Sequence, residues 1–182
     1  MIHVSDWSPN GRSLLWTEFH PVTGGEIRVA ALDGSSEVRT ITGAPFDARG
    51  AVFSPDGRWI AYASNETGID EVYVQRFPGP SPKHQISFGG GHEPVWSPTG
   101  EHIFFRGRGR MTAVPVRTFP TFSADPPRPL FADGYEVEHG IDRNYDVSKD
   151  GKRFLMLKPA RPFDPAEMTV ILNWGATLGQ TR

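Results

Sequence analysis

The stretch FSPDGRWIAYAS, residues 53–64, decides the fold of this chain. An apolar segment ends at Phe53, the four residues 54–57 follow, and a second apolar segment begins at Trp59. Proline presets its own φ angle and aspartate bonds to nearby backbone, so residues 54–57 predict a tight turn. Gly57 is expected at positive φ, which costs a glycine little. The stretch therefore predicts a β-hairpin.

The same pattern occurs four times along the chain. The segments that align without gaps are WSPNGRSLLW (7–16), FSPDGRWIAY (53–62), WSPTGEHIFF (96–105) and VSKDGKRFLM (147–156). Their serines are separated by 46, 43 and 51 residues. A period in this range indicates a repeat architecture. We treat residues 1–182 as a single domain with approximate repeats at 1–46, 47–90, 91–139 and 140–182.

The second repeat shows what one unit contains. After the hairpin, Glu71–Gln75 alternates as a half-buried strand, and His84–Ser87 supplies a fourth strand. Four short antiparallel strands in about 45 residues are the content of one propeller blade. A β-sandwich has no reason to repeat its turn four times, and no stretch shows the 3.6-residue period of a helical solenoid. The predicted fold class is all-β, a β-propeller of about four blades with four antiparallel strands each.

These residues resemble a known family. The core pattern [FW]-S-P-D-G-[RK]-x-I-A-[YF] is similar to the repeat of TolB-type β-propellers, which are related to WD-repeat proteins, and the similarity covers nearly the whole chain. The last repeat, residues 143–159 followed by 168–174, resembles the carboxyl end of propellers attached to bacterial membrane Ser/Thr kinases. The resemblance implies a parent that is an envelope protein or the sensor part of a membrane kinase, in a periplasmic or extracytoplasmic compartment.

Composition excludes several classes of partner. The chain has 19 basic and 21 acidic residues, so no excess positive charge draws it to nucleic acid or to an anionic membrane. It has no cysteine, which excludes disulfides and thiolate metal sites. Residues 1–16 lack the pattern of a signal peptide, and no run of 18 apolar residues is long enough to span a bilayer. We expect no nucleic-acid partner and no membrane insertion by this chain, and the sequence leaves its compartment unassigned.

Four blades are few for the family that the chain resembles. Three interpretations remain: a fragment, an open arc, and a half-ring completed by a second copy. An open arc exposes strand edges, which proteins normally cover. The sequence therefore predicts a homo-oligomer that completes the propeller ring.

The shared turn is expected to be structural, because the same geometry requires the same residues in every repeat. Function is then expected on the opposite rim, where the loops differ between repeats. These loops are 18–26, 42–51, 64–70, 89–94, 106–111 and 133–145.

Arg106, Arg108 and Arg110 form the densest positive cluster, with single glycines between them. One hypothesis is a site for a carboxylate, a phosphate or an acidic protein surface, since guanidinium groups bind such anions well. The alternative is a solvated hairpin turn, because a charge cluster alone specifies no partner.

Four further residues come from neighbouring connections between repeats and are expected to converge at the mouth of the channel: His92, Glu93, His139 and Asp142. Histidine and carboxylates are suitable metal ligands. No His-x-x-x-His or similar spacing fixes them, so we predict hydrogen-bonding side chains, with no metal and no cofactor.

No catalytic motif is present in the chain. The sequence lacks Gly-x-Ser-x-Gly, a phosphate-binding Gly-x-x-x-x-Gly-Lys-[Ser/Thr] loop and the kinase motifs. We predict a non-enzymatic interaction or scaffold module that binds a protein or peptide through its variable loops. The alternative is the propeller domain of an enzyme, either the gating domain of a prolyl-oligopeptidase-like peptidase or a hydrolase or lyase with a site at the channel mouth.

Overall fold

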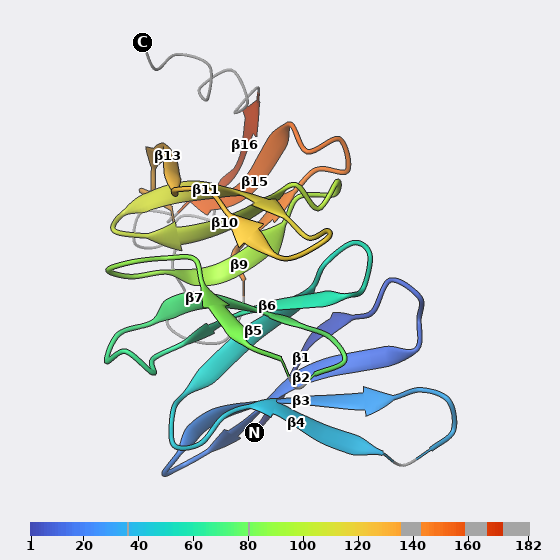
Figure 1. The fold of residues 1–182 in the computed structure, drawn as a ribbon. Coiled ribbons are helices and arrows are strands. Elements are labelled where there is room, and N and C mark those ends of the chain that lie inside the picture. Colours follow the sequence, from blue (N-terminus) through green and yellow to red (C-terminus); the bar gives the residue numbers. More distant parts are fainter. Residues whose placement is uncertain (36, 80, 136–142, 159–166, 173–182) are drawn as a thin grey trace.

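The computed structural model describes residues 1–35, 37–79, 81–135 and 143–158 and the backbone of 167–172. Their strands form four antiparallel sheets that follow one another along the chain (Figure 1). We call these sheets blades 1 to 4. The described part contains no helix, and so none that is long and apolar enough to cross a membrane.

The strands of the first two blades are β1 (Ile2–Trp7), β2 (Ser13–His20), β3 (Gly24–Ala31) and β4 (Val38–Thr42), then β5 (Ala48–Phe53), β6 (Trp59–Ser64), β7 (Glu71–Arg76) and β8 (Lys83–Gln85). Blade 3 contains β9 (His92–Trp96), β10 (His102–Gly107), β11 (Arg110–Arg117), β12 (Ser123–Ala124) and β13 (Arg128–Ala132). Blade 4 contains β14 (Tyr145–Val147), β15 (Arg153–Lys158) and β16 (Glu167–Leu172).

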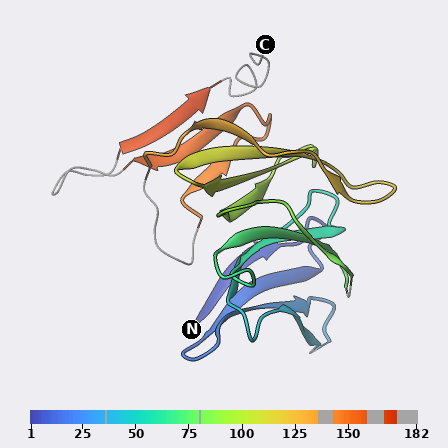
Figure 2. The same cartoon turned by 60° about the vertical axis from the view of Figure 1, so that its left-hand side comes forward.

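Within blades 1, 2 and 4, strands that are consecutive in sequence lie side by side. Blade 3 differs from the predicted four strands, because β12 and β13 pair with opposite ends of the same strand, β11. In both views the blades form a row with blade 1 and blade 4 at opposite ends (Figures 1 and 2). The predicted all-β propeller architecture is confirmed, with the described blades in an arc.

The four repeated turns have one structure. The backbone N–H of Trp59 donates to Ser54 Oγ at 3.0 Å, and the N–H of Gly57 donates to the Ser54 carbonyl at 2.8 Å. The turn glycines all have positive φ, as predicted: Gly11 at 71°, Gly57 at 68°, Gly100 at 75° and Gly151 at 68°. Three of these glycines also lie beside the turn proline of the preceding blade, in the pairs Gly57–Pro9, Gly100–Pro55 and Gly151–Pro98. The repeated turn therefore sets both the hairpin and the spacing of the blades.

The apolar core lies between successive blades. Alternate residues of a strand point to opposite faces of a sheet, so each inner blade buries both faces. In β6, Ile60 and Tyr62 pack toward blade 1, whereas Trp59 and Ala61 pack toward blade 3. A third cluster joins blades 3 and 4 around Phe104 and Phe154. The blades are thus held to one another mainly by burial of apolar side chains.

The fourth strand of blade 2 ends earlier than the sequence predicted. The expected strand covered residues 84–87, but β8 ends at Gln85. Ser87 is fully buried, and its Oγ accepts the backbone N–H of Val72 at 2.7 Å in place of a backbone carbonyl. A side-chain acceptor thus replaces the ladder hydrogen bond at this end of the sheet.

The turn geometry gives a first testable prediction. Replacing Gly57 with Ala places a Cβ at φ 68° and is expected to lower the free energy of unfolding by about 1–2 kcal/mol, because an L-residue is strained there. Gly57→Asn is expected to lower the free energy of unfolding by less, since Asn tolerates the left-handed region. Urea unfolding followed by tryptophan fluorescence measures both. Gly134→Ala is the control, because open space surrounds that glycine and its φ is not positive. Equal losses for Gly57→Ala and Gly134→Ala would contradict the argument.

Candidate functional site

Each blade has two ends. We call the end with the four repeated serine turns the turn rim. The opposite end, the loop face, is formed by the connections β2–β3, β4–β5, β6–β7, β8–β9 and β10–β11 and by residues 133–135 after β13. These connections are the variable loops to which the sequence assigned function.

Hydrogen bonds join successive loops of the loop face. The N–H of Gly25 donates to Asp47 Oδ1 at 2.6 Å, and the N–H of Asp47 donates to Asn65 Oδ1 at 2.9 Å. Arg49 forms ion pairs with both Asp47 and Asp70. The Asp70 carbonyl in turn accepts the N–H of Gly91 at 2.8 Å. Four loops from blades 1 to 3 are therefore fixed relative to one another.

Glu71 ties the β8–β9 connection to blade 2. Its side chain is buried, with 2% of the residue exposed. Oε1 accepts the backbone N–H groups of Gly89 and Gly90 at 2.5 and 3.0 Å, and Oε2 accepts the hydroxyl of Ser87. A buried carboxylate needs such donors to offset its lost hydration. Glu71 therefore shapes the loop and is not available to an external ligand.

Arg106 fits neither hypothesis for the arginine cluster, a site for an external anion or a solvated turn. It belongs to β10 and is fully buried. Its Nε and Nη2 donate to the two Asp133 oxygens at 2.7 and 2.9 Å, and Nη1 lies 3.4 Å from Glu93 Oε2. Burial acts to lower the pKa of Arg106, but the hydrogen bonds and charges of Asp133 and Glu93 outweigh it and raise the pKa. Arg106 therefore binds carboxylates of its own chain.

Glu93 has an unusual backbone, with φ at 53°. Non-glycine residues in this region are uncommon and persist where surrounding contacts hold them. The Glu93 carbonyl accepts the hydroxyl of Tyr145 at 2.7 Å, and its Oε2 accepts the N–H of Asn144 at 3.2 Å. Burial raises the pKa of Tyr145 well above its usual value, so this hydroxyl stays protonated as a donor. Glu93 thus joins blade 3 to blade 4 below the loop face.

Arg108 and Arg110 are exposed, unlike Arg106. Arg108 has φ 52°, and its Nε donates to the Gly89 carbonyl at 2.9 Å. The guanidinium lies so close to Gly89 that a Cβ on that residue would overlap it. The β10–β11 turn therefore packs against the β8–β9 connection through Arg108.

The predicted cluster at the channel mouth is described only in part. His92 Nδ1 lies 3.2 Å from Glu93 Oε1. His139 and Asp142 lie outside the described residues, so their approach to this pair stays a prediction. Within the described residues, no group of three His, Asp or Glu side chains is placed to hold a metal ion.

Exposed apolar side chains occur in the connections of the loop face. Four successive connections each present one: Val22 between β2 and β3, Phe46 between β4 and β5, Ile69 between β6 and β7, and Phe88 between β8 and β9. Phe88 is 64% exposed and precedes the glycine that Arg108 contacts. The loop face therefore combines a fixed polar framework with exposed apolar and arginine side chains.

Sequence reasoning missed both parts of this arrangement. It did not single out Phe46 and Phe88, which are in connections and exposed. It also did not single out Glu71 or Asp133 as partners for buried donors. One signal was present: acidic residues stand at the ends of several strands on this rim, among them Asp47, Asp70 and Asp133.

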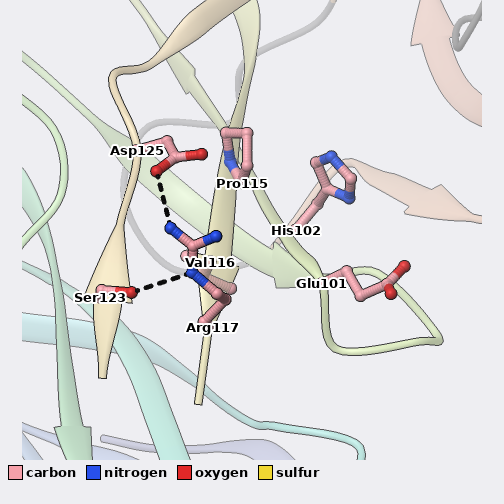
Figure 3. A pocket seen from close by; sticks show the side chains of 7 residues that line it. All are labelled: Glu101, His102, Pro115, Val116, Arg117, Ser123 and Asp125. Carbon is pink, nitrogen blue, oxygen red and sulfur yellow. Dashed lines mark hydrogen bonds and ion pairs between the residues drawn. The ribbon is translucent and has the colours of Figure 1, made fainter. Parts of the chain in front are cut away.

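A shallow pocket lies at the other end of blade 3, on the turn rim (Figure 3). Its lining residues are Glu101, His102, Pro115, Val116, Arg117, Ser123 and Asp125. Arg117 reaches Asp125 and Ser123 at 3.5 Å each, and the Arg117 side chain is largely exposed and that of Asp125 partly exposed. Exposed ion pairs of this kind contribute little free energy. The pocket has no buried charged side chain, and Pro115 and Val116 are its apolar lining residues, so the loop face is the better candidate site.

Solved structures with a similar fold are β-propellers. TolB from Acinetobacter baumannii aligns with a TM-score of 0.66 at 20% identity, covering 93% of this chain and 40% of that one. The β-propeller domain of the trilobed protease from Pyrococcus furiosus, described as having an open velcro topology, aligns at 0.55 and 15% identity, covering 93% and 54%. A puromycin-hydrolyzing peptidase from Mycobacterium tuberculosis aligns at 0.60 and 20% identity, covering 91% and 26%.

The fold and these similarities define the class of protein: the chain has an all-β, TolB-like β-propeller fold. The chain spans between about a quarter and just over half of the length of these structures. They include both TolB and propellers that belong to peptidases. No family model matches the chain, and no curated protein sequence matches it significantly.

Proposed function

We propose that this chain is a non-enzymatic interaction module and that its loop face binds a protein or peptide. The observation that carries the proposal is that four successive connections of one rim each have an exposed apolar side chain, namely Val22, Phe46, Ile69 and Phe88. Aromatic and arginine side chains supply much of the binding free energy at protein interfaces. The loop face offers both residue types: Phe88 is exposed next to the glycine that Arg108 contacts, and Arg110 is exposed two residues after Arg108.

The polar framework below supports binding by the loop face. Ion pairs and hydrogen bonds of Asp47, Arg49, Asp70 and Glu71 fix the loops before a partner arrives. Loops that are already ordered lose less conformational entropy on binding. The partner that fits best is a segment with apolar side chains and at least one carboxylate for the exposed arginines.

The same framework argues for binding rather than catalysis. Glu71, Glu93 and Asp133 each accept hydrogen bonds from neighbouring groups of the chain. A general acid or base must be within hydrogen-bond reach of a substrate. Since these carboxylates already have internal donors, the chain is proposed to act without catalysing a reaction.

Selection of peptides from a displayed random library on the immobilised chain tests this function. The dissociation constant of a selected peptide is then measured by fluorescence anisotropy. Phe88→Ser is expected to weaken binding at least tenfold, because it removes an exposed aromatic side chain. Arg110→Ser is expected to weaken the binding of peptides that carry a carboxylate. Both side chains are exposed, so the fold is expected to tolerate these changes.

Phe119→Ser is the matched control. Phe119 is also exposed, at 81%, but it lies between β11 and β12 at the turn rim. Unchanged binding by this variant together with weak binding by Phe88→Ser supports the proposal. Failure to enrich any peptide, or equal losses for the two variants, would overturn it. The homo-oligomer predicted from the repeat count is a separate proposal, because its contact surface lies at the ends of the blade row.

A further inference from the structure

No other sheet of the described residues packs on the outer face of blade 1. It faces away from blade 2, at one end of the row (Figures 1 and 2). Val4 and Trp7 of β1 are 63% and 57% exposed there, and Ile2 is exposed as well. Their strand register places Val4 opposite Trp16 and Trp7 opposite Leu14, both of which are half-buried. We call Ile2, Val4, Trp7, Leu14 and Trp16 the blade 1 face.

The repeat shows what such a surface is built to contact. Trp16 is equivalent to Tyr62, Phe105 and Met156, and Leu14 is equivalent to Ile60, Ile103 and Phe154. All six equivalents are buried, and their clusters join each of blades 2, 3 and 4 to the blade before it. The blade 1 face therefore has the residue types of a blade–blade interface with only one side of that interface in place.

Blade 4 carries the complementary surface at the other end of the row. Phe154 and Met156 of β15 are buried against blade 3, so the alternate residues Leu155 and Leu157 point the other way. Leu155 is 38% exposed. It is equivalent to Leu15, which packs against blade 2, and to Phe104, which packs against blade 4. At each interface between successive blades, the residue equivalent to Leu155 on one blade thus belongs to the same apolar cluster as the residue equivalent to Trp16 on the next blade.

We propose that the blade 1 face binds a second copy of this chain, through the Leu155 face of blade 4 of that copy. The contact repeats between two molecules the interface that joins successive blades within one molecule. It is heterologous, since two different surfaces meet, so every copy has one surface of each kind. Tryptophan is enriched among residues that dominate binding free energy, and this surface offers two. Neither surface belongs to the loop face, so this contact is separate from the proposed binding of a protein or peptide.

Complementation between two blocked variants tests this arrangement. Val4→Glu and Leu155→Glu each place a charge on one of the two surfaces, at positions exposed enough for the single chain to fold. Molar mass is measured by light scattering and sedimentation at about 100 μM and 1 μM, a range that covers typical micromolar dissociation constants. The wild-type chain is expected to form dimers or larger assemblies at the higher concentration, and each variant alone is expected to be monomeric.

An equimolar mixture of the two variants is expected to form a one-to-one heterodimer. Val4→Glu retains an intact blade 4 surface and Leu155→Glu retains an intact blade 1 face, so one contact remains possible. Phe119→Glu, at the turn rim, is expected to associate like the wild type. A monomeric wild-type chain at about 100 μM overturns the proposal. So does a mixture that stays monomeric, or a Leu155→Glu variant that still dimerises, which would indicate that two blade 1 faces bind each other.

Discussion

Replacing Arg106 with Ala is expected to lower the free energy of unfolding by about 3–5 kcal/mol, the usual cost of removing one partner of a buried ion pair. Arg106 is fully buried, and it bonds to both oxygens of Asp133 and lies beside Glu93. Without the guanidinium, two carboxylates with little exposure to water lose their principal cation. Urea unfolding followed by tryptophan fluorescence measures the change.

A second substitution separates this cause from a simple loss of packing. Asp133→Asn in the Arg106→Ala background removes one of the uncompensated charges, so it is expected to recover part of the lost stability. Arg108→Ala is the matched control, because that arginine is exposed and two residues away. A loss below about 1 kcal/mol for Arg106→Ala, comparable with an ordinary surface substitution, would show that the buried pair is not important for stability.

Replacing Phe154 with Ala is expected to cost about 3–5 kcal/mol, because it opens a cavity between blades 3 and 4. Phe154 is fully buried, and its ring lies 5.0 Å from that of Phe104 and 5.5 Å from that of Phe131, both edge to face. Hydrogen exchange gives the more specific readout. Amides of β14 and β15 are expected to lose protection, whereas those of β5 to β7 keep it, because blade 4 meets the rest of the described chain through this cluster.

Leu155→Ala provides the control on the adjacent residue. Leu155 is partly exposed on the opposite side of β15, so at a protein concentration of about 1 μM the change is expected to cost under about 1 kcal/mol. Equal losses at the two positions would mean that the interface between blades 3 and 4 is not tightly packed. Protection lost evenly over all blades would mean that the blades unfold as one cooperative unit.

Together these predictions separate two roles on the loop face. Arg106 and Glu93 are expected to affect stability, because they bind groups of their own chain. Phe88 and Arg110 are expected to affect binding with little effect on stability, because they are exposed. The arginine cluster seen in the sequence thus contains residues with different functions.

Local chemistry was enough to predict the repeat, the hairpin and the propeller blade. The serine turn depends on residues at most five positions apart, such as Trp59 N–H with Ser54 Oγ, and on a glycine at positive φ. Interactions of this range are specified within each ten-residue segment, so they can be recognised from the chain alone. The alternating apolar strands on either side likewise follow from the period of a β-strand.

The fate of individual polar and aromatic residues depends instead on contacts between distant segments. Arg106 and Arg108 look alike in the sequence, but Arg106 is buried because Asp133, 27 residues away, lies against it. Phenylalanine is a residue type that is common in protein cores, yet Phe88 is exposed because it lies in a connection between blades. Burial is a property of the packed blades, since only their stacking determines which side of a strand meets an apolar neighbour and which end of a blade meets water.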